Sequence, residues 1–212
     1  MYAFIHGVIL AFGLIIPLGV QNVFIFNQGA SQPQLRFALP SVLTAFICDT
    51  LLITLAVLGV SMIVLQFAWL KLILFIVGFI FLMIMGFSTW KTKSSSDQQQ
   101  HGAFSIKKQI YFAASVSLLN PHAIIDTVGV IGTNSLNYIG HHKWLFSIGC
   151  ILVSLLWFFG LAIAGSFVKK IDKSGTWMNM VNKVSALVIW GVGFYILWQV
   201  VLILKDTTIT IS

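Results

Sequence analysis

The chain has 212 residues, of which 58% are hydrophobic and only 8% are charged. Soluble globular domains carry about 25% charged residues, so this composition excludes a soluble enzyme, a disordered tail and a nucleic-acid-binding protein. The formal net charge is +7, and the basic residues lie between long apolar runs. This arrangement favours loops that face anionic lipid head groups over an acidic soluble partner.

Six apolar stretches are long enough to cross a bilayer, whose hydrocarbon core of about 30 Å needs about 20 residues of helix. In chain order they are Tyr2–Phe26, Phe37–Leu65, Trp69–Trp90, Ile110–Leu136, Trp144–Val168 and Val184–Leu204. The sequence therefore predicts an all-α polytopic membrane protein with six transmembrane helices. Because the first stretch contains Pro17 and Gly19, a second topology stays open, in which this stretch only dips into the membrane and five spans remain.

Basic residues are concentrated in alternate loops. The first, third and fifth loops hold nine of them, namely Arg36, Lys91, Lys93, Lys107, Lys108, Lys169, Lys170, Lys173 and Lys183. The opposite side holds three, namely Lys71, Lys143 and Lys205. The positive-inside rule then predicts that the nine face the cytoplasm and, with six spans, that both termini lie outside.

The longest polar stretch, residues 91–108, has the composition of a flexible linker and contains three serines followed by an aspartate and three glutamines. It separates a first three-helix half, residues 1–90, from a second half, residues 109–212. Because each half has an odd number of spans, the second half enters the membrane in the opposite sense. The sequence thus predicts two inverted three-helix repeats, a common plan in secondary transporters.

The first and fourth apolar stretches each contain a proline, and a polar residue follows each proline by five positions. Pro17 precedes Asn22, and Pro121 precedes Asp126. Proline removes a helical N–H, so both helices are predicted to be broken at these points, with Pro17 and Gly19 forming a hinge. Interrupted segments in corresponding places of two halves point to a transporter binding site. Two ordinary proline kinks are the alternative reading.

Asn120 and Pro121 together predict that a helix restarts inside the membrane, because Asn is a favoured N-cap and Pro is favoured at the first helical position. Such a helix start presents unpaired N–H groups and a positive dipole end. We expect it to hold a substrate carboxylate, together with Gln21 and Asn22.

Asp49 and Asp126 are the acidic residues deep inside the predicted spans. A central Asp costs roughly 2.5 to 3.5 kcal/mol on insertion scales, so it usually faces a cavity and has a function. The pair is predicted to bind a cationic group or to carry a proton. Either Asp could instead cap a broken helix or bind a neighbouring hydroxyl group.

His122 lies four positions before Asp126 and could be a proton relay, although a role as a local hydrogen-bond partner is equally open. No metal site is predicted, because the spans supply too few oxygen ligands for Mg or Mn and too few nitrogen or sulfur ligands for Zn or Cu.

At these residues the sequence resembles the LysE/ArgO family of bacterial basic amino-acid exporters. The resemblance rests on Pro17-Leu18-Gly19-Val20-Gln21-Asn22, on Leu119-Asn120-Pro121-His122 with Asp126-Thr127, and on Trp157-Phe158-Phe159-Gly160-Leu161-Ala162. The family's first motif usually reads P-L-G-P-Q-N, so Val20 replaces its second proline here. The resemblance implies a bacterial cytoplasmic membrane protein that exports L-arginine or L-lysine without ATP. It also implies a functional aspartate pair at Asp49 and Asp126.

The sequence therefore predicts a secondary exporter of basic amino acids and not an enzyme, with no cofactor and no ATP-binding G-x-x-x-x-G-K loop. Moving a monocation outward costs about 2.3 kcal/mol per 100 mV of membrane potential, which favours proton antiport. The expected partners are a basic amino acid, protons and the bilayer, and a homo-oligomer is left open. The alternatives are an exporter of neutral amino acids on the same fold, a cation transporter and a membrane-embedded enzyme.

Overall fold

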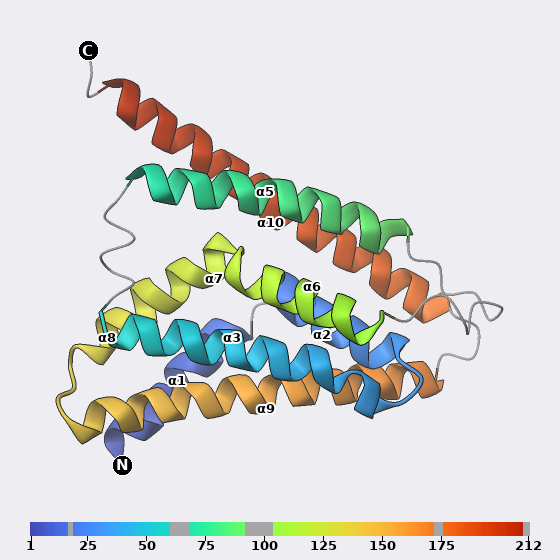
Figure 1. Cartoon of the computed structure of the whole chain (residues 1–212), viewed down its shortest axis with the longest axis horizontal. Coiled ribbons are helices and arrows are strands. Elements are labelled where there is room, and N and C mark those ends of the chain that lie inside the picture. Colours follow the sequence, from blue (N-terminus) through green and yellow to red (C-terminus); the bar gives the residue numbers. More distant parts are fainter. Residues whose placement is uncertain (17–18, 60–67, 92–103, 172–175, 210–212) are drawn as a thin grey trace.

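The long apolar runs form helices, as they must in lipid, where each backbone N–H and C=O needs a partner within the protein. The computed structural model describes residues 1–16, 19–59, 68–91, 104–171 and 176–209, shown in Figure 1. Its elements are α1 (Tyr2–Ile15), α2 (Val20–Ser31), η1 (Leu35–Phe37), α3 (Leu39–Val57), α5 (Ala68–Lys91), α6 (Ile106–Leu118), α7 (Pro121–Asp126), η2 (Thr127–Gly132), α8 (Thr133–Ser135), α9 (His141–Ile171) and α10 (Thr176–Ile209). Within these ranges the regular structure is helical throughout.

Three helices in the described part of the chain are long and apolar enough to cross a membrane. They are α3, residues His141–Lys170 of α9 and residues Asn182–Leu202 of α10. The pair α1 and α2 would be a fourth span if the two helices cross the membrane together. The apolar part of α5 over Phe75–Lys91 is shorter, and the predicted fourth stretch is divided among α6, α7, η2 and α8. The prediction of an all-helical membrane protein is confirmed, whereas six spans remain a prediction.

Both predicted breaks coincide with helix ends. The axes of α1 and α2 differ by 81°, and Gly19 precedes α2 with φ −76° and ψ 169°. Pro17 lies outside the described residues. In the second half, α6 ends at Leu118 and α7 begins at Pro121, where a restart is expected. The predicted linker 91–108 also falls largely outside the described residues, between Lys91 and Phe104.

One feature that the sequence does not predict follows Asp126, where the chain continues as the wider π-helical turn η2. π-Helical turns are rare overall, but those that occur are often found at functional sites. Two of the six residues in this turn are Gly129 and Gly132. η2 packs against α3, and a Cβ added at Gly132 would lie 3.3 Å from the carbonyl oxygen of Ala56.

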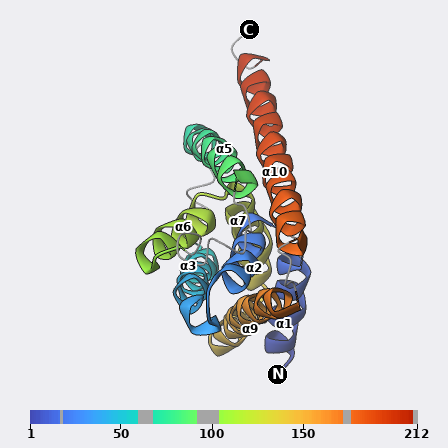
Figure 2. The same ribbon diagram turned by 90° about the vertical axis from the view of Figure 1, so that its right-hand side faces the viewer.

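The packing of the two halves is reciprocal. Helices α1 and α2 of the first half pack along α9 of the second half, while α6 and η2 of the second half pack along α3 of the first. Helices α3 and α9 contact each other, and so do α5 and α10. Figure 2 shows α5 and α10 as a pair on one side of the layer that contains α3 and α9.

Hydrogen bonds bring three loops together at one end of the bundle, here named the basic end. Gln32 donates its side-chain N–H to the carbonyl oxygen of Phe104, and Gln109 donates to that of Phe37. Lys169 Nζ donates to the carbonyl oxygen of Gln32. The first, third and fifth loops, which carry most of the basic residues, therefore share one end. At the opposite end, His6 Nδ1 and the Tyr138 hydroxyl group lie 2.7 Å apart.

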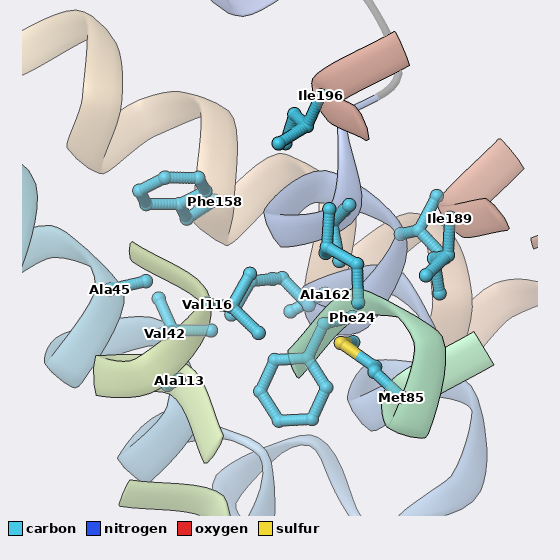
Figure 3. Packing of buried hydrophobic residues seen from close by; sticks show 14 of the residues in the cluster. Phe24, Val42, Ala45, Met85, Ala113, Val116, Phe158, Ala162, Ile189 and Ile196 are labelled. Carbon is cyan, nitrogen blue, oxygen red and sulfur yellow. The ribbon is translucent and has the colours of Figure 1, made fainter. Parts of the chain in front are cut away.

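A large apolar cluster of buried side chains is shown in Figure 3. On α2, α3, α6 and α9 it occupies the half of the bundle next to the basic end, and on α5 and α10 it continues past the middle to Phe75, Ile196 and Val200. It combines residues of both halves: Phe24, Val42, Ala45, Met85, Ala113, Val116, Phe158, Ala162, Ile189 and Ile196. Because the contributing helices interdigitate here, this half of the bundle has a packed interior.

Glycines allow the backbone of α9 to pack directly against the backbone of α2. A Cβ at Gly165 would overlap the carbonyl oxygen of Phe26 and lie 2.9 Å from the amide nitrogen of Ala30. A Cβ at Gly29 would overlap the carbonyl oxygen of Ala162 in the same way. Small residues at such contacts are typical of helix packing in membranes, where close van der Waals contact stabilises association.

We expect Gly165→Ala to lower the free energy of unfolding by about 1 to 3 kcal/mol, because the added methyl group forces α2 and α9 apart. Gly160→Ala is the matched control on the same helix, since a Cβ there has no neighbour within 4 Å. Thermal unfolding of the two variants in detergent measures the difference. Equal melting temperatures would contradict the proposed close contact.

Candidate functional site

A cavity of about 250 Å³ lies between the two halves of the chain. Its wall contains six of the residues predicted from the sequence, namely Gly19, Gln21, Asn22, Asp49, Asn120 and Asp126. The remaining lining residues are Ala11, Leu14, Ile15, Ile53, Ala123, Thr127, Ile131, Cys150, Ser154 and Val192. Pro121 and His122 are the first two residues of α7, but their side chains lie outside the described part of the structure.

The cavity occupies the middle of the bundle and the half away from the basic end. On α3, which starts at the basic end, the wall begins at Asp49 and continues to Ile53. On α9, which runs toward the basic end, it extends from Cys150 to Ser154 and no further. The α1–α2 segment contributes nothing beyond Asn22, which lies just past its break. On α2, α3 and α9 the lining gives way to the packed apolar cluster of Figure 3, and Ile15 and Val192 both line the cavity and pack against that cluster.

Asp49 is held by two hydrogen bonds from two other elements. Gln21 Nε2, in the first turn of α2, donates to Oδ1 at 2.9 Å, and Ser154 Oγ on α9 donates to Oδ2 at 2.8 Å. Both donors favour the ionised form of a carboxylate. Gln21 is predicted to hold a substrate carboxylate, but in this structure its N–H group serves Asp49.

Asp126 reaches the same cavity from the opposite half of the chain. It is the last residue of α7, directly before η2, and it is partly buried, as is Asp49. Asp49 and Asp126 thus come from opposite halves of the chain and line one cavity. Among the described residues that line the cavity, these two carboxylates are the charged groups and no basic side chain accompanies them. The cavity is therefore suited to a cation.

Asn22 joins the two sides of the first break. Its Nδ2 donates at 2.6 Å to the carbonyl oxygen of Ile15, the last residue of α1. The last carbonyl groups of a helix lack partners within that helix, so this bond replaces one that the break removes. A structural role for Asn22 is thus evident beside the predicted role in substrate binding.

Ser154 is a site residue that the sequence reasoning missed. It is a single hydroxyl group in a long apolar run of α9, and a polar residue inside a span is the signal that could have identified it. Cys150, one turn earlier, also lines the cavity, and its Sγ lies 3.4 Å from the carbonyl oxygen of Gly7. Its burial agrees with the packing role expected of a free cysteine.

Comparison with known proteins places the chain in a family of transporters. The family model for LysE type translocators matches residues 12–200. The chain belongs to the LysE family. This confirms the resemblance seen in the sequence. It follows that the chain is a multi-pass membrane transporter and not an enzyme.

Several relatives of this LysE-family chain are bacterial transporters. It is 55% identical over 195 residues to "Putative amino-acid transporter YisU" of Bacillus subtilis (strain 168), covering 92% of this chain and 89% of the relative. It is 32% identical over 191 residues to "Arginine exporter protein ArgO" of Escherichia coli O157:H7, covering 88% and 89%. The ArgO of Salmonella typhi is 31% identical over 195 residues, covering 90% and 91%. No solved structure matches the chain.

We expect Asn22→Ala to lower the free energy of unfolding by about 1 to 3 kcal/mol in the absence of substrate, because the Ile15 carbonyl group loses its donor. Asn27→Ala is the matched control in the same helix, since the buried Oδ1 of Asn27 has no hydrogen-bond partner in the described structure. Thermal unfolding without amino acid measures both. If the two variants are equally stable, Asn22 does not hold the break together.

Proposed function

We propose that this LysE-family chain exports basic L-amino acids, arginine or lysine, from the cytoplasm in exchange for protons. The observation that carries the proposal is the pairing of Asp49 and Asp126 on one cavity wall that has no basic side chain among its described residues. Arginine export is the named activity of the ArgO relatives. The side chain of a basic amino acid would bring a positive charge to these two carboxylates, which a neutral amino acid does not supply.

The cavity offers separate places for the two ends of a basic amino acid. The guanidinium or ammonium group of the side chain lies at Asp49 and Asp126, and apolar side chains such as Ile53 and Ile131 contact its methylene stem. The α-carboxylate lies at the second break, where Asn120 and the start of α7 at Pro121 supply donors. Asn22 lies on the same wall and completes this end of the site.

The reciprocal packing of α1–α2 on α9 and of α6–η2 on α3 supports two inverted repeats. It also supports a first segment that crosses the membrane. Its start lies near Tyr138, through His6, and its end lies near Lys169, through Gln32, at opposite ends of α9. A re-entrant loop would return to the end at which it began.

The basic end faces the cytoplasm by the positive-inside rule. The cavity then lies in the outer half of the bundle, and the apolar cluster next to the basic end closes it from the cytoplasm. In the transport cycle this cluster must open so that a cytoplasmic substrate can reach Asp49. The flexing points are the two breaks, at Pro17–Gly19 and Asn120–Pro121, which interrupt the helices beside the cavity.

Proton exchange supplies the driving force for export against the membrane potential. A substrate cation arriving from the cytoplasm favours both aspartates in the ionised form and so releases any proton that they hold. Re-protonation from outside then weakens the binding of the cation and ejects it. His122, adjacent to Pro121 on α7, is the candidate relay for this proton.

We expect Asp49→Asn and Asp126→Asn each to abolish arginine efflux, because each removes half of the cation site while leaving a residue of the same shape. Asp97→Asn, in the polar linker, is a control for loss of an acidic residue. Efflux from arginine-loaded proteoliposomes, with proton uptake recorded in parallel, measures the effect. Normal arginine efflux by both single variants would refute the cation site, and efflux without proton movement would make the protein a uniporter.

A binding competition decides between basic and neutral substrates. Unlabelled arginine and lysine should displace bound radiolabelled arginine, while threonine and leucine should not. Displacement of arginine by threonine or leucine at similar concentrations would assign the chain to the neutral amino-acid exporters.

A further inference from the structure

The hydroxyl group of Ser154 behaves differently from other helical hydroxyl groups in this structure. Four other hydroxyl groups donate to the carbonyl oxygen four residues earlier in their own helix, namely those of Ser117, Ser147, Thr44 and Thr54. This is the usual partner of such groups in membrane helices. Ser154 Oγ instead donates across the cavity wall to Asp49 Oδ2, from α9 to α3. Ser154 is only 3% exposed, so the bond lies away from bulk water.

The two donors to Asp49 are not equivalent in chemistry. The Gln21 amide nitrogen can donate a hydrogen bond but cannot accept one, whereas a hydroxyl group does both. When Asp49 takes up a proton, Ser154 Oγ can accept that proton's hydrogen bond without moving any heavy atom. Gln21 Nε2 would have to turn away or offer its oxygen atom instead. Ser154 is therefore the partner that fits both protonation states of Asp49.

We propose that Ser154 is a positioning residue that sets the balance between cation and proton at Asp49. This inference rests on the proposed function, in which Asp49 holds either a substrate cation or a proton. With the hydroxyl group in place, ionised Asp49 keeps two donors and competes well for the cation. Without it, protonation of Asp49 becomes easier, and the cation binds only at higher pH.

The test is the pH profile of arginine binding to the purified full-length protein in lipid nanodiscs. We expect Ser154→Ala to move the midpoint of this profile upward by roughly one pH unit, because the charge-assisted hydrogen bond lost from the ionised carboxylate is stronger than the bond lost from the protonated acid. At pH values well above the midpoint, binding should return to within about threefold of the wild-type affinity. Ser154→Thr keeps the hydroxyl group and should retain the wild-type midpoint.

Ser147→Ala is the matched control, since Ser147 lies two turns earlier on α9, is 2% exposed and bonds only within its own helix. The proposal is overturned if Ser154→Ala keeps the wild-type midpoint, or if it weakens binding by the same factor at every pH. Asp49→Asn distinguishes a failure of the proposed function from a failure of the role proposed for Ser154. If Asp49→Asn binds arginine normally, the proposed function fails; if it does not bind and Ser154→Ala has a normal profile, only the role of Ser154 fails.

A second inference comes from a different observation, the amide network at the basic end. Gln32 Nε2 donates to Phe104 O at 3.0 Å and to Gln28 Oε1 at 3.3 Å. Gln109 Nε2 donates to Phe37 O at 2.9 Å and to the same Phe104 O at 3.0 Å. Gln32 is 4% exposed and Gln109 is 1% exposed. Two buried amides thus connect the first loop to the start of α6.

The network is not fully satisfied, because the buried Oε1 of Gln109 has no hydrogen-bond partner in the described structure. A buried acceptor without a partner destabilises the state in which it occurs. The unpaired Oε1 therefore offsets part of the stability that the amide hydrogen bonds give to the closed state, and opening would let water bind to Oε1. The position also matters, since the network lies at the cytoplasmic mouth behind the apolar cluster that closes the cavity.

We infer that Gln32 and Gln109 form the cytoplasmic latch of the transporter, closed while the cavity lies in the outer half. This inference rests on the proposed alternation between two cavity positions but not on the identity of the substrate. Removing one amide should shift the equilibrium toward the state that is open to the cytoplasm. The expected shift is about two- to tenfold, because one bond of each amide joins the first loop to the start of α6, while its second bond is local.

A cysteine at the cavity wall reports this shift. In a chain carrying Cys48→Ala and Cys150→Ala, the substitution Ala123→Cys adds one thiol at a partly buried lining position. Membrane-impermeant maleimide is applied to right-side-out and to inside-out vesicles. Gln109→Leu or Gln32→Leu should increase labelling from the cytoplasmic side and reduce it from the outside. Gln34→Leu, an exposed glutamine of the same loop, should change neither.

Unchanged labelling from both sides in both latch variants would overturn the latch. Increased labelling from both sides together would also overturn it, because that result indicates general loosening rather than a shift between two states. Arginine is absent from this assay, so a failure of the proposed substrate does not affect its outcome.

Discussion

The structure depends on the need of a carboxylate within the membrane for hydrogen-bond donors. Asp49 obtains them from Gln21 on one side and Ser154 on the other, so α2 and α9 must both approach α3 at the same depth. Gln21 can reach Asp49 because it lies in the first turn of a helix that begins in the middle of the bundle. The break between α1 and α2 places the start of α2, and with it the Gln21 side chain, at the depth of Asp49.

A break creates its own unpaired groups, and the structure satisfies at least one of them locally. Asn22, the residue after Gln21, donates its side-chain N–H to the carbonyl oxygen of Ile15 at the end of α1, whereas Gln21 donates to Asp49. These adjacent side chains therefore have different roles, since Gln21 binds the carboxylate in the cavity and Asn22 binds a backbone carbonyl group. Close packing of the segment on α9 through Gly29 and Gly165 then fixes both side chains relative to Ser154. Stability and the site geometry consequently rest on the same helix contacts.

Sequence reasoning identified the parts of this arrangement that rest on composition and local chemistry. Proline and polar residues located the breaks, and the cost of buried charge singled out Asp49 and Asp126. Three features depend on contacts between distant elements and could not be derived from spacing. The turn of Gln21 toward Asp49 needs the 81° bend, the partner of Ser154 lies on another helix, and the wide turn after Asp126 has no sequence rule as clear as proline's. Charge counting grouped three loops on one side, and their hydrogen bonds at the basic end agree with it.

The energy needed for alternation can be compared with what closes the basic end. Converting a two-state equilibrium from 1:99 to 99:1 takes about 5.5 kcal/mol of differential binding. Three described hydrogen bonds join different segments there, namely from Gln32 to the Phe104 carbonyl group, from Gln109 to that of Phe37 and from Lys169 to that of Gln32. At about 0.5 to 1.5 kcal/mol each, they contribute a stabilisation of the same order. A cation bound between two aspartates can supply a free energy of this size, whereas separation of the whole apolar cluster from all its neighbours would cost far more. Opening is therefore best accomplished by movement at the breaks that parts the cluster along one path to the cavity, keeps the rest of it packed and exchanges the polar bonds at its edge for water.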